Sequence, residues 1–166
     1  MGNHVYIAIP VMALLAIFES SVLSRFPVAG VTPQLLFIVA LGWGIHRGLE
    51  EGLIWAFIAG LFTDLFSLAP LGISSLAFMA GVGVPLMLQP VLPPRRLLAA
   101  MFLAALGTVI YLIVYALALR VFGFGTSLRG LIDTLPLIIF HAVLIVPVYL
   151  LLASLLRMFH PRRVEL

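Results

Sequence analysis

The chain has 166 residues, of which 64% are hydrophobic and only 9% are charged. Charged residues make up about a quarter of a soluble domain, so this composition excludes a soluble globular protein and indicates an integral membrane protein. Cysteine is absent, which excludes disulfides, thiolate metal sites and cysteine nucleophiles. At roughly 20 apolar residues per crossing, the length leaves room for about six helices. We therefore expect residues 1–166 to form a single membrane domain with no soluble domain.

Six apolar segments follow one another along the chain, and we expect each to be a transmembrane helix of a compact all-α bundle. They cover residues 5–23, 33–45, 53–68, 73–92, 97–122 and 131–156. The first segment is longer than a signal-peptide core and has no Lys or Arg before it, so we expect a retained helix. The second segment is short for a full crossing. It stops at the polar cluster of residues 46–51, where we expect a loop and a solvated His46.

All nine basic residues are arginines, and their distribution predicts the orientation of the bundle. With six crossings, one side of the membrane would hold six arginines and the other side three. The six are Arg47, Arg95, Arg96, Arg157, Arg162 and Arg163. Both termini lie on this side, so we expect both to be cytoplasmic. We expect Arg95, Arg96, Arg162 and Arg163 to anchor the chain to lipid headgroups.

Three acids fall toward the outer halves of their helices in this topology: Glu19, Asp64 and Asp133. A charged side chain near the bilayer centre costs about 2.5 to 3.5 kcal/mol on insertion scales, so it normally faces other helices and has a partner. We expect ion pairs or helix-cap hydrogen bonds that stabilise the bundle. The alternative is that these three acids line a cavity.

Small residues precede Asp64 on the third segment. Gly52, Ala56, Gly60 and Asp64 recur every four residues and therefore share one face of a helix. Small residues at this spacing allow a neighbouring membrane helix to approach closely. The pattern predicts that Asp64 points inward, toward other helices.

A tight turn is predicted after Asp64. Pro70 and Gly72 bracket this turn, and the hydroxyls of Ser74 and Ser75 offer a cap for the helix that follows. The result would be a hairpin on the outer side with almost no loop.

Polar side chains also lie in the last two segments. Thr108, Tyr111 and Tyr115 share one face of the fifth segment and offer hydroxyl partners to a carboxylate such as Asp64. The alternative is that the tyrosines simply lie near the membrane interface. His141 lies about ten residues into the sixth segment, and we expect it to form a hydrogen bond between helices rather than a proton relay.

The sequence contains no established catalytic motif. Ser20, Ser21, Asp64 and His141 include the residue types of a nucleophilic triad, but a nucleophile elbow, paired metal ligands and a glycine-rich phosphate loop are absent. We therefore expect no catalytic residues, no cofactor and no metal site. No basic patch interleaved with aromatic residues points to nucleic-acid binding.

Several short motifs stand in a fixed order in the first half of the chain. They are Glu19-Ser20-Ser21-Val22-Leu23, residues 27–30, Pro33-Gln34-Leu35-Leu36, Gly60-Leu61-Phe62-Thr63-Asp64-Leu65 and Pro70-Leu71-Gly72. Together they resemble the MreD family, the rod shape-determining membrane proteins of bacteria, over about residues 19–80. The family commonly has an acid after the proline of its second helix, where this chain has Gln34. The resemblance therefore gives no ionic role to that position.

The resemblance implies a non-enzymatic component of the cell-elongation machinery (the elongasome) in the bacterial inner membrane. MreD proteins work with MreC and, through it, with MreB, RodA and a class B penicillin-binding transpeptidase that extend lateral peptidoglycan. The resemblance also implies a fold similar to the substrate-binding subunits of energy-coupling-factor transporters.

A vitamin-binding subunit of such a transporter is the alternative function. In that case Glu19, Asp64, Asp133, Tyr111 and Tyr115 would surround an outward-facing cavity. The short linker, residues 69–72, leaves no room for a lid over such a cavity and favours a scaffold.

Overall fold

The computed structural model describes residues 4–25, 27, 30–67, 69–92, 96–124 and 133–159. Six α-helices lie in these ranges: α1 (His4–Ser21), α2 (Leu35–Arg47), α3 (Leu49–Leu65), α4 (Ile73–Leu88), α5 (Arg96–Val121) and α7 (Leu135–Phe159). Two short 3-10 helices, η1 (Leu23–Arg25) and η2 (Gln89–Val91), follow α1 and α4. The expectation of an all-helical protein is confirmed.

Four helical stretches in the described ranges are long and apolar enough to cross a membrane. They are Tyr6–Arg25, Ile73–Val91, Leu97–Val121 and Leu135–Arg157. With 13 and 17 residues, α2 and α3 are shorter than the roughly 20 residues of a typical crossing. The four long stretches mark the chain as a membrane protein, and crossing of the membrane by α2 and α3 stays a prediction.

The loop predicted at residues 46–51 is wrong, because only Gly48 separates α2 from α3. The backbone φ of Gly48 is +97°, a value that favours glycine. Glu50 and Glu51 lie in the first turn of α3, where the helix dipole favours negative charge. Arg47, the last residue of α2, forms an ion pair with Glu51 at 3.1 Å. The charges that suggested a loop therefore stabilise a helix start.

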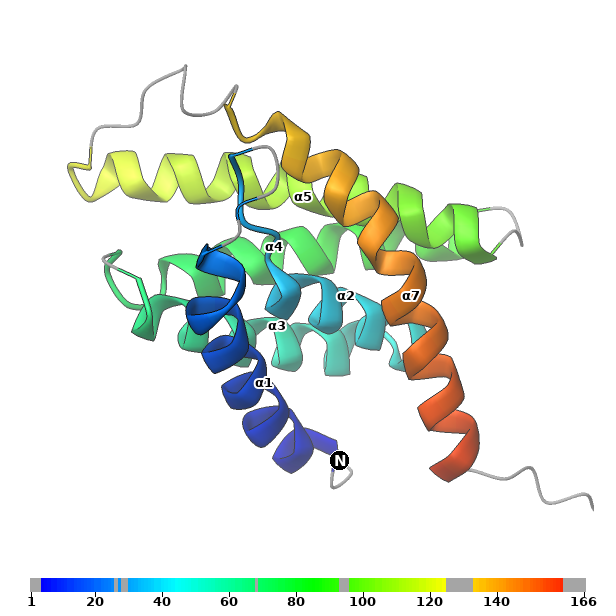
Figure 1. Cartoon of the computed structure of the whole chain (residues 1–166). Helices are drawn as coiled ribbons and strands as arrows, with labels where there is room; N and C mark the ends of the chain where they lie inside the picture. The colour runs from blue at the N-terminus through cyan, green and yellow to red at the C-terminus, as the bar shows by residue number, and fades with distance from the viewer. Residues whose placement is uncertain are drawn as a thin grey trace, which may run out of the picture.

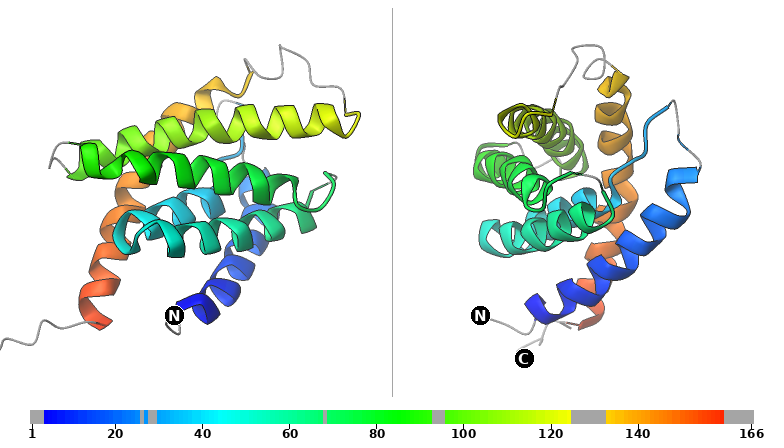
Figure 2. Two further views of the ribbon diagram at one scale, coloured as in Figure 1. Left: turned by 180° about the vertical axis from the view of Figure 1, so that it is seen from behind. Right: turned by 90° about the vertical axis from the view of Figure 1, so that its left-hand side faces the viewer.

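The four helices α2 to α5 lie side by side, and each packs against the next in sequence (Figure 1). Helices α1 and α7 cross the same face of this group: α1 contacts α2 and α3, whereas α7 contacts α2 and α5. The start of α1 and the end of α7 lie at the same end of the molecule (Figure 2). This arrangement places α2 at the centre, and eight of its 13 residues are buried.

Phe37, near the start of α2, is the centre of a buried aromatic cluster. Its ring centroid lies 5.2 Å from that of Phe78 on α4, 5.4 Å from Tyr111 on α5 and 5.6 Å from His141 on α7. Aromatic rings at such distances pack favourably. One side chain of the central helix therefore joins three neighbouring helices.

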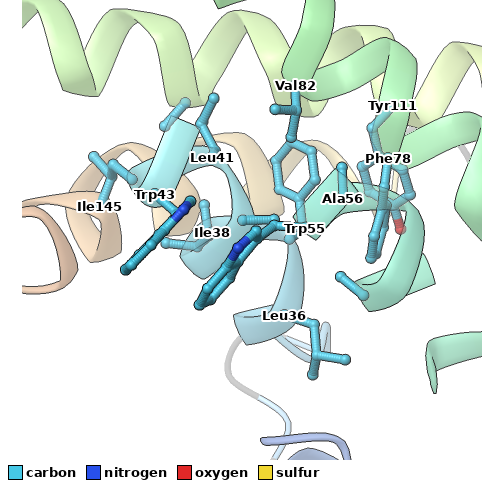
Figure 3. Packing of buried hydrophobic residues seen from close by; sticks show 14 of the residues in the cluster. Leu36, Ile38, Leu41, Trp43, Trp55, Ala56, Phe78, Val82, Tyr111 and Ile145 are labelled. Atoms are coloured by element: carbon cyan, nitrogen blue, oxygen red, sulfur yellow. The ribbon is translucent and has the colours of Figure 1, made fainter. Parts of the chain in front are cut away.

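Further aromatic pairs lie along α2 toward its carboxyl end. Trp43 stacks on Trp55 of α3, with ring centroids 4.2 Å apart (Figure 3). The expectation that His46 is solvated is wrong, since its ring stacks on Tyr149 of α7 at 4.3 Å. The His46 Nε2 atom also lies 3.1 Å from the Tyr149 carbonyl oxygen. These contacts attach the end of α2 to both α3 and α7.

The small face of α3 is in close contact with two other helices. A Cβ atom added to Gly60 would lie 2.3 Å from Ser75 Cα, so the backbones of α3 and α4 touch there. A Cβ atom added to Gly52 would lie 2.9 Å from Gly44 Cα, on α2. Ala56, between these two glycines, is fully buried. The spacing that indicated close packing thus corresponds to real backbone contact.

Candidate functional site

Asp64 lies at the end of α3 and is only 2% exposed. Its carboxylate accepts hydrogen bonds from the backbone N–H of Gly72 at 2.6 Å and of Ser74 at 3.2 Å. The first N–H groups of a helix have no partner within that helix, so Asp64 caps α4 from the neighbouring helix. The predicted cap by serine hydroxyls is wrong: Asp64 caps α4, and Ser75 Oγ instead donates to the Phe57 carbonyl oxygen on α3.

The turn between α3 and α4 brings these groups together. Gly72 has a backbone φ of +97° and a left-handed conformation, which a side chain would strain. The Pro70 carbonyl oxygen accepts a hydrogen bond from the Ile73 N–H at 3.4 Å. The chain reverses within a few residues, and the start of α4 returns to the carboxylate of Asp64.

Glu19, at the end of α1, caps α2 in the same manner. Its Oε2 atom accepts hydrogen bonds from the backbone N–H of Leu35 at 2.8 Å and of Leu36 at 3.4 Å. A negative charge at a helix N-terminus is favoured by the helix dipole. Two of the three acids singled out in the sequence are therefore held by cap hydrogen bonds rather than by arginines.

His141 is fully buried on α7 and bonds two other elements. Its Nε2 accepts a hydrogen bond from the Gln34 N–H at 3.0 Å, and its Nδ1 lies 2.9 Å from Thr108 Oγ1. A backbone N–H can only donate, so Nε2 carries no proton and Nδ1 holds the proton of the neutral ring. Nδ1 then donates to Thr108, whose own proton goes to the Ala104 carbonyl oxygen at 2.6 Å.

The first turn of α2 is thus held from two sides. Gln34 is bonded by a side chain of α7, and Leu35 and Leu36 are bonded by a side chain of α1. These partners lie 107, 16 and 17 positions apart in the sequence. Sequence reasoning missed the pairing because no local pattern reports contacts at such separations.

The hydroxyls of Thr108, Tyr111 and Tyr115 on α5 were expected to offer hydrogen bonds to a carboxylate such as Asp64. The hydrogen bonds that Asp64 accepts come instead from backbone N–H groups. Thr108 is bonded to His141. Tyr111 is buried in the aromatic cluster, and its ring centroid lies 6.0 Å from that of Tyr115. These three side chains therefore pack α5 against its neighbours.

The remaining predicted residues stand apart from the caps. Asp133, just before α7, is exposed, in contrast to the buried Asp64. Helix α5 begins at Arg96, whose anchoring role stays a prediction. The predicted anchors Arg95, Arg162 and Arg163 lie outside the described residues.

A cavity of about 210 Å³ lies between the ends of α1 and α3 and the start of α2. The described residues of its lining are Ala16, Glu19, Ser20, Ser24, Thr32, Gln34, Leu36, Phe62, Thr63, Phe66 and Ser67. Small-molecule sites usually measure about 300 to 1,000 Å³, so this cavity is small for a vitamin. Asp64, Asp133 and the two tyrosines are not in this lining. Within the described ranges, His, Asp and Glu side chains form no group of three that would hold a metal ion.

Long apolar helices and acids that cap buried helix ends define this protein as a polytopic membrane protein with a structural polar interior. The chain belongs to the MreD family, because the family model for rod shape-determining protein MreD matches residues 2–159. No curated protein matches the chain, and no solved structure does. The expected likeness to the substrate-binding subunits of energy-coupling-factor transporters therefore stays a prediction.

Proposed function

We propose that this protein is a membrane scaffold of the bacterial cell-elongation complex, where it binds MreC and helps to organise lateral peptidoglycan synthesis. Membership of the rod shape-determining MreD family supports this function. Through MreC the protein would act with MreB, RodA and a class B penicillin-binding transpeptidase. In this role it holds partners in place and performs no chemistry of its own.

The observation that carries the proposal is the capping of two helix starts by Glu19 and Asp64. Both carboxylates are bonded to backbone N–H groups of neighbouring helices. These bonds fix the relative positions of α1, α2, α3 and α4 and leave large apolar side chains on the outside of α1, α4, α5 and α7. A rigid bundle with an apolar exterior suits docking of the membrane helix or juxtamembrane segment of MreC.

We also propose that the chain crosses the inner membrane six times, with both termini in the cytoplasm. The arginine distribution supports this orientation. The start of α1 and the end of α7 lie at the same end of the molecule, as an even number of crossings requires (Figure 2).

Co-purification tests the proposal directly. Tagged protein is captured from membranes of rod-shaped cells, and MreC is measured in the eluate of the wild type, Asp64→Asn, Asp64→Leu and the control Asp133→Asn. We expect Asp64→Leu to lose both MreC and complementation of rod shape, because the cap on α4 is lost. We expect Asp133→Asn to behave as the wild type, because Asp133 is exposed.

Two outcomes count against the proposal. Absence of MreC from the wild-type eluate would contradict the proposed partner. If both Asp64 variants reach the membrane at normal levels and retain MreC and rod shape, the role given to Asp64 in the dock is wrong.

A further inference from the structure

Hydrogen-bond acceptors dominate the lining of the cavity between α1, α2 and α3. Of the five hydroxyls on the described lining, all but that of Thr32 donate their protons to backbone carbonyl groups close by in sequence. The four donors are Ser20, Ser24, Thr63 and Ser67, which donate to the carbonyl oxygens of Ile17, Ser20, Ala59 and Asp64. A hydroxyl has one proton and two lone pairs. These four oxygens therefore offer the cavity only acceptors.

The Glu19 carboxylate and the Gln34 Oε1 atom add further acceptors. The Glu19 carboxylate lines the cavity and can only accept when ionised. Gln34 Oε1 is buried and has no hydrogen-bond partner among the described residues, and such an orphaned oxygen indicates a missing donor. Among the residues that the structure describes, the lining includes no Arg, Lys or His, and its formal charge there is that of Glu19.

The surroundings of the cavity are apolar and face outward. The side chains of Phe18, Leu65 and Phe66 are exposed. Phe66 belongs to the lining, and Phe18 directly precedes the lining residue Glu19. In a membrane protein such side chains contact acyl chains. Arg25, which follows the lining residue Ser24, is also exposed. These features match the groups of a zwitterionic lipid one by one. The acceptors inside the cavity suit its ammonium group, the Arg25 cation suits its phosphate, and the exposed apolar side chains suit its acyl chains.

We propose that this cavity binds the primary ammonium group of a zwitterionic phospholipid headgroup such as phosphatidylethanolamine. The three N–H donors of the ammonium group meet the carboxylate of Glu19 and the hydroxyl oxygens of α1 and α3. The lipid phosphate lies on the side of Arg25, and the acyl chains run along the exposed side chains of α1. A quaternary ammonium, as in phosphatidylcholine, has no N–H donor to offer. This proposal does not rest on the proposed binding of MreC.

Lipid exchange followed by native mass spectrometry tests the site on the full-length protein. The protein is equilibrated with equal amounts of phosphatidylethanolamine and phosphatidylcholine that carry the same acyl chains. We expect the wild type to retain the ethanolamine lipid about tenfold more than the choline lipid, as one charge-assisted hydrogen bond provides. Glu19→Gln should abolish this preference, because glutamine keeps a carbonyl oxygen for the α2 cap but removes the charge.

A second variant tests the site even if Glu19→Gln does not fold. Ser24→Leu fills the cavity without touching the Glu19 cap, and we expect it to abolish the preference as well. Ser154→Leu is the matched control, because Ser154 is also exposed and also donates to the carbonyl four residues earlier. It should retain the wild-type preference.

Three results would overturn the proposal. The first is equal retention of the two lipids by the wild type. The second is a preference that persists in Ser24→Leu, whether or not Glu19→Gln folds. The third is complete displacement of the lipid by an equimolar amount of soluble phosphoethanolamine, which would make the site one for free amines rather than for lipid.

Discussion

Glu19 of α1 and His141 of α7 bond neighbouring backbone groups at the start of α2. Glu19 Oε2 accepts from the Leu35 N–H at 2.8 Å, and His141 Nε2 accepts from the Gln34 N–H at 3.0 Å. Lipid offers no partner for these N–H groups. The two helices that cross the bundle therefore supply the caps that allow the central helix to begin in the interior.

His141→Phe should destabilise the protein by about 1–3 kcal/mol, the cost of leaving a buried donor unpaired. Phenylalanine keeps the ring beside Phe37 but offers no acceptor to the Gln34 N–H. Thr108→Val removes the other partner of the imidazole. Because both residues belong to one chain of hydrogen bonds, the double variant should lose less than the sum of the two single losses. Thermal unfolding in detergent measures all three, and strictly additive losses would contradict the hydrogen-bond chain.

The proton of the His141 ring should reside on Nδ1. The Gln34 N–H occupies Nε2 as a donor, so only Nδ1 remains to donate to Thr108. Nitrogen-15 NMR of histidine-labelled protein distinguishes the two tautomers, and the His141→Phe spectrum identifies the signal among the four histidines. A signal with the proton on Nε2 would show that the bond to Gln34 is absent.

Asp64→Ala should lower the free energy of unfolding by about 1–2 kcal/mol, the usual effect of removing a helix cap. Asp64→Asn keeps one carbonyl oxygen for the Gly72 and Ser74 N–H groups and should lose less. Asp133→Ala is the matched control and should change nothing, because Asp133 is exposed. Equal stability of Asp64→Ala and Asp133→Ala would mean that the cap contributes little.

The sequence predicted the helices and the small face of α3, because both depend on local composition and spacing. The sequence alone does not decide whether Glu19 and Asp64 form ion pairs or helix caps. Distance explains this: Leu35 lies 16 positions from Glu19. Which backbone group meets a carboxylate depends on how helices cross, and spacing along one helix does not report it. The loop expected at residues 46–51 failed for another reason, since acids are as typical of a helix start as of a loop.

Gly60→Ala should be among the most damaging single-methyl changes in the chain. The new Cβ would lie 2.3 Å from the Cα and N atoms of Ser75, so α3 and α4 would have to separate, at a cost of about 1–3 kcal/mol or more. Gly83→Ala is the control, because its Cβ would meet no backbone atom and only the ends of two leucine side chains, Leu53 at 3.0 Å and Leu49 at 4.0 Å. That variant should remain close to the wild type, since alanine also favours the helix. Similar unfolding temperatures for the two variants would contradict the backbone contact.

Trp43 and Trp55 are the two tryptophans of the chain, and their rings lie nearly parallel, with an interplanar angle of 13°. Trp43 Nε1 donates to Glu51 Oε2 at 3.0 Å, whereas Trp55 Nε1 is buried without a hydrogen-bond partner among the described residues. Either change to phenylalanine should abolish the near-ultraviolet circular dichroism of the stacked pair.

The two variants should nevertheless differ in stability. Trp43→Phe removes a hydrogen bond to a carboxylate, whereas Trp55→Phe removes a donor that is already unsatisfied. We therefore expect Trp43→Phe to lose about 1 kcal/mol more than Trp55→Phe. Thermal unfolding in the same detergent compares them, with the loss of ring volume common to both. A larger loss for Trp55→Phe would indicate that its N–H group has a partner, such as a buried water molecule, in the folded protein.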